Sequence, residues 1–373
     1  MTGLYIHIPF CRSRCLYCDF YSTTLPQAWQ MPYVDAIAGE MELRPYAEPI
    51  STIYIGGGTP SQLTSEALHR LFHALTEHYQ IDSKAEITIE ANPDDVTPEW
   101  IIALKETPVN RISMGVQSLN DDILRLLHRR HTAQQAQKAV ELLQGAGYSN
   151  LSLDLIYGLP NQTLELFRND VETLLSWDIS HLSAYALQYE EGTPLFVLRQ
   201  EGKVKEADEE LSLACYESLM DLTAKADMEH YEISNFARLG FRARHNSSYW
   251  TGQPYIGLGA GAHSYDGKQL RSYNCEDLKA YIQSIEKGES PSTTEHLDEN
   301  MRYNERVMLS LRTIEGLSLT NLERDFGTAR KEYCERMAKA HIQRGSIKKT
   351  GENLCLTRRS LFVSDDIISD LMV

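Results

Sequence analysis

Three cysteines lie within eight residues near the start of the sequence: Cys11, Cys15 and Cys18. An apolar stretch that predicts a strand precedes them, so one loop carries all three thiols. Soft thiolates are typical ligands of iron–sulfur clusters and of zinc, but structural zinc takes four ligands and no fourth Cys or nearby His follows. Three thiolates on a four-iron cluster leave one iron open for chemistry. The spacing favours a four-iron, four-sulfur (4Fe-4S) cluster, with zinc or a Cys15–Cys18 redox pair as the alternatives.

Six short apolar runs alternate with amphipathic runs in the first half of the chain. Strands are expected at 4–8, 52–55, 86–91, 111–116, 151–157 and 182–187. Helices are expected at 33–43, 65–79, 98–106, 120–127, 133–147 and 164–177. Six such units imply a parallel sheet with right-handed crossovers, whereas a closed barrel would need two more units. We predict an α/β fold with an open (β/α)6 partial TIM barrel; a doubly wound sheet is the alternative.

Residues suited to ligand binding lie at or near the ends of these predicted strands. They are Gly57, Gly58, Thr59, Glu90, Gln117, Asp154 and Ala186. Active sites of α/β barrels lie at the carboxyl ends of the strands, so these residues are expected to meet the cysteine loop. Glycines admit close backbone approach, and the carboxylates accept hydrogen bonds from amino or hydroxyl groups. The alternatives are a tight turn for the glycines and strand-end caps or ion pairs for the carboxylates.

The sequence changes character after about residue 192. A charged helix is expected over 201–227, followed by an aromatic, glycine-rich stretch over 231–273. Helices at 304–312, 319–326 and 331–344 with a hairpin at 348–356 predict a small C-terminal α+β, winged-helix-like element. We divide the chain into a barrel at 1–200, an accessory segment at 201–290 and a C-terminal domain at 291–373.

The composition limits the compartment and the partners. The chain is 42% hydrophobic and 24% charged, with a formal net charge of −16. This charge repels phosphate backbones, so no nucleic-acid partner is expected, and the winged-helix pattern is not interpreted as DNA-binding. No transmembrane segment and no secretion signal are expected. Seven cysteines without an export signal suit a reducing, cytoplasmic location.

Several motifs in order resemble the radical S-adenosylmethionine (SAM) superfamily, and the resemblance covers essentially the whole chain. They are C-x3-C-x2-C at 11–18, YIHIPFC at 5–11, GGGTP at 56–60, SMGVQ at 113–117, LDLIYG at 153–158 and YEISNF at 231–236. The branch they resemble contains oxygen-independent coproporphyrinogen III oxidase and the HemW-type haem chaperones. The resemblance implies a 4Fe-4S cluster on the three cysteines, SAM on its open iron, and the methionyl end of SAM at the Gly57–Thr59 edge.

Three further residues are candidate contacts near the cluster and SAM. Tyr17 and Tyr5 offer aromatic faces, although both residue types are more often part of a core. Arg129 is a candidate partner for a carboxylate, with a solvated helix end as the alternative. The cysteines outside the loop are interpreted as structural.

The sequence departs from the oxidase pattern and resembles the chaperone branch. The oxidase carries a fourth cysteine where this chain has Phe20, and it has a long segment before its cluster that is not expected here. The H-N-x-x-Y-W pattern of the chaperone branch is present as His245, Asn246, Tyr249 and Trp250.

This motif predicts a haem contact. An imidazole can ligate haem iron, the aromatic residues offer flat faces, and Arg242 and Arg244 are candidate partners for propionates. The alternative is a packed loop in which His245 is simply hydrogen-bonded.

The resemblance implies a haem-binding chaperone that transfers haem to acceptor proteins, such as respiratory proteins. It leaves open acceptors at the membrane and a homodimer. The runner-up function is a radical enzyme acting on coproporphyrinogen or another tetrapyrrole. Coproporphyrinogen oxidation is not expected, and no catalytic residue is assigned.

Overall fold

The computed structural model describes residues 2–373, and its centre is a curved sheet. The first six strands are β1 (Thr2–Ile8), β2 (Ile50–Gly57), β3 (Ile81–Ala91), β4 (Arg111–Gln117), β5 (Leu151–Tyr157) and β6 (His181–Ala186). They are adjacent in chain order, and every neighbouring pair is parallel. The predicted six-unit α/β arrangement is therefore confirmed.

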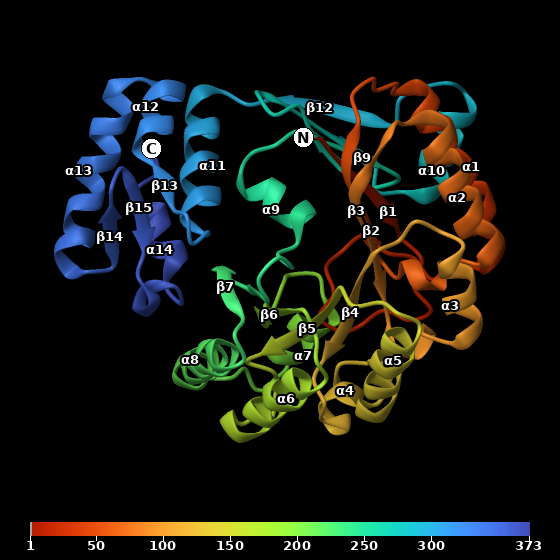
Figure 1. Cartoon of the computed structure of the whole chain (residues 1–373), viewed down its shortest axis with the longest axis horizontal. Helices are drawn as coiled ribbons and strands as arrows, with labels where there is room; N and C mark the ends of the chain where they lie inside the picture. The colour runs from red at the N-terminus through yellow and green to blue at the C-terminus, as the bar shows by residue number, and fades with distance from the viewer. Residues whose placement is uncertain (1) are drawn as a thin grey trace.

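Helices cover the outer face of these strands (Figure 1). They are α1 (Gln30–Leu43), α2 (Ser65–His78), α3 (Pro98–Lys105), α4 (Asp121–Leu126), α5 (Ala133–Gly145) and α6 (Leu164–Ser176). Threonine side chains begin several of them: Thr64 accepts from Ala67 N at 3.1 Å, and Thr97 accepts from Trp100 N at 3.2 Å. These hydrogen bonds satisfy amide groups that the first helical turn leaves free, which explains why the expected helix starts were accurate.

Alternation along the strands separates an apolar outer face from a polar inner face. In β1, Leu4, Ile6 and Ile8 are fully buried in the main core, while Tyr5 and His7 point the other way. The inner polar residues of the other strands include Thr52, Tyr54, Glu86, Glu90, Arg111, Ser113, Asp154, His181 and Ser183. The strands thus use one face for stability and leave the other suited to polar ligands.

Six additional strands extend both edges of the sheet. On the β1 side, β9 (Tyr255–Leu258) runs parallel to β1 and is followed by β10 (His263–Tyr265), β11 (Leu270–Asn274) and β12 (Ser292–His296). On the β6 side, the sheet continues with β8 (Asn235–Ala237) and β7 (Glu229–Glu232). The resulting twelve-stranded sheet ends at β12 and β7, so the barrel is open. Glycine is required at the β9–β10 contact, because a Cβ on Gly257 would lie 1.9 Å from the carbonyl oxygen of His263.

The charged helix expected over 201–227 is present as α8 (Glu209–Lys225), but it starts later than predicted. It is preceded by α7 (Pro194–Gln200), and the two helices are separated by a turn in which Gly202 has a φ of 69°. Asp208 begins α8 by accepting from Leu211 N at 2.8 Å. The left-handed glycine after α7 and the Asp208 cap therefore account for the later start of the helix.

The C-terminal unit has its own buried core (Figure 1). It contains α11 (Glu299–Leu311), β13 (Leu317–Ser318), α12 (Leu319–Phe326), α13 (Thr328–Arg344), β14 (Ile347–Thr350), β15 (Asn353–Leu356) and α14 (Ser364–Asp370). The expected helices and the β14–β15 hairpin are present. The expected boundary at residue 291 falls just before β12, which still belongs to the main sheet.

Two further helices connect these parts. α9 (Arg244–Trp250) contacts both β2 and α11, and α10 (Leu278–Glu286) packs on α1. Within residues 2–373, no helix combines the length and the apolar character needed to cross a membrane.

Candidate functional site

The cysteine loop lies at the carboxyl ends of the strands. The Sγ of Cys11 is 3.4 Å from Oγ1 of Thr59, directly after β2. The Sγ of Cys15 accepts from Nη1 of Arg129 at 3.4 Å, and Leu16 N donates to Leu127 O. The fold thus brings the loop together with two of the regions from which ligand contacts were predicted.

Burial affects the protonation of the three thiols in the loop. Cys11, Cys15 and Cys18 are all partly buried, and burial raises the pKa of Cys11 and raises that of Cys18 to about 11. Metal binding must therefore displace thiol protons. Within residues 2–373, no three His, Cys, Asp or Glu side chains are close enough together to hold one metal ion.

Glycines bring the β2 end against the β1 end. Gly57 has a φ of 112°, and a Cβ there would lie 2.5 Å from Cε1 of His7. A Cβ on Gly58 would lie 2.7 Å from the carbonyl of Pro9. The edge that leads to Thr59 therefore requires residues without side chains, as expected for backbone that contacts a ligand closely.

Two carboxylates point to the inner face near this edge. Glu90 accepts from the Tyr54 hydroxyl at 2.7 Å and from Gly57 N at 3.1 Å, while Asp154 accepts from Ser113 Oγ at 3.4 Å. Burial raises the pKa of Glu90 to about 7 and that of Asp154 to about 6. Carboxylates that titrate close to neutral pH on a polar inner face are typical of functional sites.

Arg129 contacts different groups from the carboxylate expected for it. It donates to Asn92 Oδ1 at 2.7 Å and to the carbonyl oxygen of Gly115 at 2.5 Å, in addition to Cys15. This guanidinium therefore connects the cysteine loop to the ends of β3 and β4. Asn92 was not among the predicted residues, although its position directly after β3 is the same signal that identified the others.

The remaining predicted residues lie at or near the mouth of the barrel, the end at which the cysteine loop meets the carboxyl ends of the strands. They occupy different environments. Gln117 has a φ of 68°, an uncommon conformation for a residue other than glycine, and its side chain lies over Gly115. Ala186 ends β6 and is half-buried. The Tyr5 hydroxyl bonds Nδ1 of His7 at 3.0 Å. Tyr17 belongs to the cysteine loop and packs against a small apolar cluster. Its ring therefore contributes to the core as well as lying next to the candidate cluster ligands.

The predicted haem motif forms α9, and its histidine is enclosed. His245 is 1% exposed; Nδ1 lies 2.9 Å from Oγ1 of Thr52 and Nε2 lies 2.8 Å from the Tyr249 hydroxyl. Burial, together with the positive charge of Arg111, lowers the pKa of His245 to about 3. Glu86 accepts from the backbone N–H groups of the first two residues of α9. The imidazole is thus neutral, with both nitrogens occupied in this conformation.

The two arginines expected beside haem propionates have other partners. Arg242 pairs with Glu229 and with Glu315, each at 2.7 Å. Arg244 donates to the carbonyl oxygen of Lys84 at 2.7 Å. Arg242 is therefore paired with carboxylates of the protein, while Arg244 donates from one guanidinium nitrogen to the backbone.

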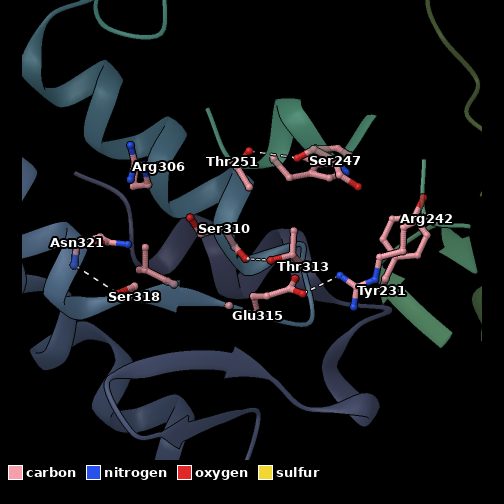
Figure 2. Close-up of a pocket in the computed structure, with 13 residues that line it drawn as sticks. Tyr231, Arg242, Ser247, Thr251, Arg306, Ser310, Thr313, Glu315, Ser318 and Asn321 are labelled. Atoms are coloured by element: carbon pink, nitrogen blue, oxygen red, sulfur yellow. Dashed lines mark hydrogen bonds and ion pairs between the residues drawn. The ribbon is translucent and has the colours of Figure 1, made fainter. Parts of the chain in front are cut away.

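A cavity of about 390 Å³ lies between α9 and the C-terminal unit (Figure 2). Its lining residues are Tyr231, Arg242, Ser247, Trp250, Thr251, Arg306, Ser310, Thr313, Glu315, Gly316, Leu317, Ser318 and Asn321. Nε1 of Trp250 is buried and has no hydrogen-bond partner among the described residues, and Arg312 lies 5.7 Å from its ring. Asn246 is half-buried on the same helix. The residues of the motif therefore face two different places. His245 and Tyr249 are hydrogen-bonded to each other on the barrel side of α9, and Trp250 borders the cavity.

Comparison with known proteins identifies two regions. Residues 5–174 match the radical SAM superfamily, and residues 297–363 match the HemN C-terminal domain. The "Heme chaperone HemW" of Bacillus subtilis is 34% identical, with 98% of each chain covered. The proteins of the same name are 37% identical in Lactococcus lactis, over 87% of this chain and 85% of the relative, and 33% identical in Escherichia coli, over 91% of each.

A solved structure has the same fold. Coproporphyrinogen III oxidase (HemN) from Escherichia coli superimposes with a TM-score of 0.86 at 22% identity, covering 100% of this chain and 90% of the other. This similarity supports the open (β/α)6 architecture with its C-terminal unit. The sequence relatives are more specific, and on their evidence the chain belongs to the HemW family of the radical SAM superfamily.

Proposed function

We propose that this chain is a haem chaperone that holds a 4Fe-4S cluster on Cys11, Cys15 and Cys18 and SAM at the adjoining strand ends. The observation that carries the proposal is the gathering of the cysteine loop, Thr59 and Arg129 at one end of the barrel. Three cysteine ligands leave one iron for the amino and carboxylate groups of SAM. The similarity to relatives named heme chaperones supports the role in haem transfer.

The residues of the mouth have separate roles in this proposal. The backbone of Gly57 and Gly58 holds the methionyl end of SAM, and Glu90 and Asp154 accept hydrogen bonds from its amino or hydroxyl groups. Arg129 orients the loop through Cys15. A cluster held by Cys11, Cys15 and Cys18 would supply, when reduced, the electron for cleavage of a sulfonium C–S bond of SAM.

The haem contacts in this proposal come from the α9 motif. The Trp250 ring offers a flat face at the cavity, and Nε1 is an unused donor. Ligation of iron by His245 requires that its hydrogen bond to Thr52 or to Tyr249 breaks first. The haem is then delivered in the cytoplasm to acceptor proteins, including respiratory ones, by a monomer or a homodimer.

Two assays on one preparation test the function. The protein is reconstituted anaerobically with iron and sulfide, and haem binding and coproporphyrinogen decarboxylation are then measured in parallel. We expect retained haem and no decarboxylation, because Phe20, which is 67% exposed, stands where the oxidase has a fourth cysteine. Decarboxylation without retained haem would favour the oxidase function instead.

Variants then locate the haem site. His245→Ala removes the candidate iron ligand, and Trp250→Ala removes the face at the cavity. We expect His245→Ala to alter the haem spectrum and to slow transfer. If only Trp250→Ala weakens binding, the chaperone function stands and the iron ligand is another group.

A further inference from the structure

Tyr54 occupies a central position on the inner face of the barrel. It lies in β2, and its ring is stacked with Tyr5 of β1 at 6.3 Å and with His245 of α9 at 5.3 Å between centroids. The two ring planes are tilted from it by only 25° and 30°. Because both neighbours are themselves hydrogen-bonded, the Tyr54 ring has little freedom to turn.

The hydroxyl of Tyr54 is directed at one carboxylate. It donates to Oε1 of Glu90 at 2.7 Å, while Oε2 accepts from Gly57 N at 3.1 Å. Gly56 makes room for this pair, since a Cβ there would lie 2.8 Å from Cε1 of Tyr54 and 2.9 Å from Oε1 of Glu90. The orientation of Glu90 is therefore fixed from both of its oxygens.

We propose that Tyr54 is a positioning residue: it turns the Glu90 carboxylate toward the Gly57 edge and keeps that carboxylate ionised for a cationic ligand. The inference rests on the proposed binding of SAM at this edge, whose amino and sulfonium groups supply the positive charge. Tyr54 itself acts through Glu90.

The groups around Glu90 explain why this hydrogen bond matters. Tyr5, Tyr54, Arg111, Asp154 and Tyr249 face it from β1, β2, β4, β5 and α9. The pKa of Glu90 is raised to about 7, mainly by burial and in part by the charge of Asp154, while the Tyr54 hydroxyl, Gly57 N and Arg111 lower it. Loss of the hydroxyl leaves burial less opposed, so the pKa of Glu90 rises and a smaller fraction of the carboxyl group is ionised at pH 7.

The test compares Tyr54→Phe, Glu90→Gln and the double variant, using SAM affinity of the anaerobically reconstituted protein between pH 6 and 9. In the wild type, affinity should rise through pH 7. Tyr54→Phe should bind about tenfold more weakly at pH 7, as expected for a lost hydrogen bond to a charged group, and recover toward pH 9. Glu90→Gln should be weak at every pH, and adding Tyr54→Phe to it should change nothing. Tyr265→Phe, which removes a hydroxyl bonded to Lys268 O, is the control and should match the wild type.

A second measurement does not depend on SAM. The carboxyl ¹³C signal of Glu90, assigned by its absence in Glu90→Gln, is titrated in cluster-free protein with and without Tyr54→Phe. We expect the midpoint to move to higher pH in the variant. An unchanged midpoint, or equal weakening of SAM binding in the wild-type and Glu90→Gln backgrounds, would refute the role of Tyr54. Failure of the wild type to bind SAM would refute the proposed function instead, and the titration would still decide the role of Tyr54.

Discussion

The two ends of the barrel interior respond to burial in opposite ways. At the carboxyl ends of the strands, burial raises the pKa of Glu90 and of Asp154 to about 7 and about 6. At the other end, burial lowers the pKa of His245 to about 3. The imidazole is neutral and both its nitrogens have partners within 2.9 Å, whereas the contacts of Asp154 with the Ser113 hydroxyl are long, at 3.4 Å from each oxygen. The mouth therefore retains capacity for a ligand, and the α9 end uses its polar groups for stability.

The strongest test of this difference concerns the loop at the mouth. Replacing Cys11, Cys15 or Cys18 by Ala should each abolish bound iron, sulfide and the brown colour after anaerobic reconstitution, because each thiol binds a separate iron. Cys275→Ala is the matched control, since Cys275 is also partly exposed, and it should retain the cluster. Full iron content in any of the three loop variants, or one zinc without sulfide in the wild type, would contradict the cluster.

The glycine edge should be the most sensitive part of the backbone. Gly57→Ala should lower the free energy of unfolding by roughly 2–5 kcal/mol, because it combines a positive φ with a clash against His7. Gly240→Ala has a φ of 87° but nothing within 4 Å of the added Cβ, and should cost only about 1 kcal/mol. Urea denaturation of both variants measures the difference. Equal losses would show that the contact with His7 relaxes at no cost.

Removing one hydroxyl at each end compares their hydrogen bonds. Thr52→Val leaves Nδ1 of His245 buried without a partner and should lower the free energy of unfolding by about 1–3 kcal/mol. Ser113→Ala removes only the long contacts to Asp154 and should cost less than about 1 kcal/mol. The larger loss in Ser113→Ala would mean that the mouth, and not the α9 end, depends on its internal hydrogen bonds.

The pH dependence of stability should have opposite signs at the two ends. The pKa of His245 is about 3 in the folded protein and about 6.5 when unfolded, so its contribution is complete above pH 6.5 and is lost as the pH falls. The pKa of Glu90 is about 7 when folded and about 4.5 when unfolded, so the ligand-free protein loses stability as the pH rises between these values.

Variants separate these two contributions. His245→Gln should reduce the acid loss between pH 5.5 and 4.5 by about 1.4 kcal/mol, the value for one proton over one pH unit. Glu90→Gln should remove part of the loss on raising the pH from 4.5 to 7. Urea midpoints measured across this range check both, and unchanged slopes would show that the two side chains are not the groups that titrate.

The sequence was informative wherever structure follows from local pattern. Apolar runs and threonine caps predicted β1 to β6 and their helices, since each depends on neighbouring residues alone. Glu90 and Asp154 were predicted near the cysteine loop because the carboxyl ends of parallel strands meet at one edge.

Contacts between distant segments could not be predicted. Thr52 and His245 are 193 residues apart, and nothing in the α9 motif indicates that β2 supplies its partner. The strands β9 to β12 have three to five residues each. Gly257 was visible in the sequence, but the close backbone contact that requires it was not. Arg129 was named as a candidate partner for a carboxylate, but its hydrogen bonds to Asn92 and to the carbonyl oxygen of Gly115 could not be predicted.

The position of β1 between β2 and β9 has a consequence for biosynthesis. Leu4 pairs beside Ile53 on one side and beside Ile256 on the other, so the first strand made is completed by one of the last. At about 5–20 residues per second, roughly 10–50 s pass between synthesis of β1 and of β9. During that time an apolar strand presents an unpaired edge, which is a template for wrong pairing. The nascent chain is therefore most exposed to aggregation before β9 pairs with β1, and slower translation lengthens that period.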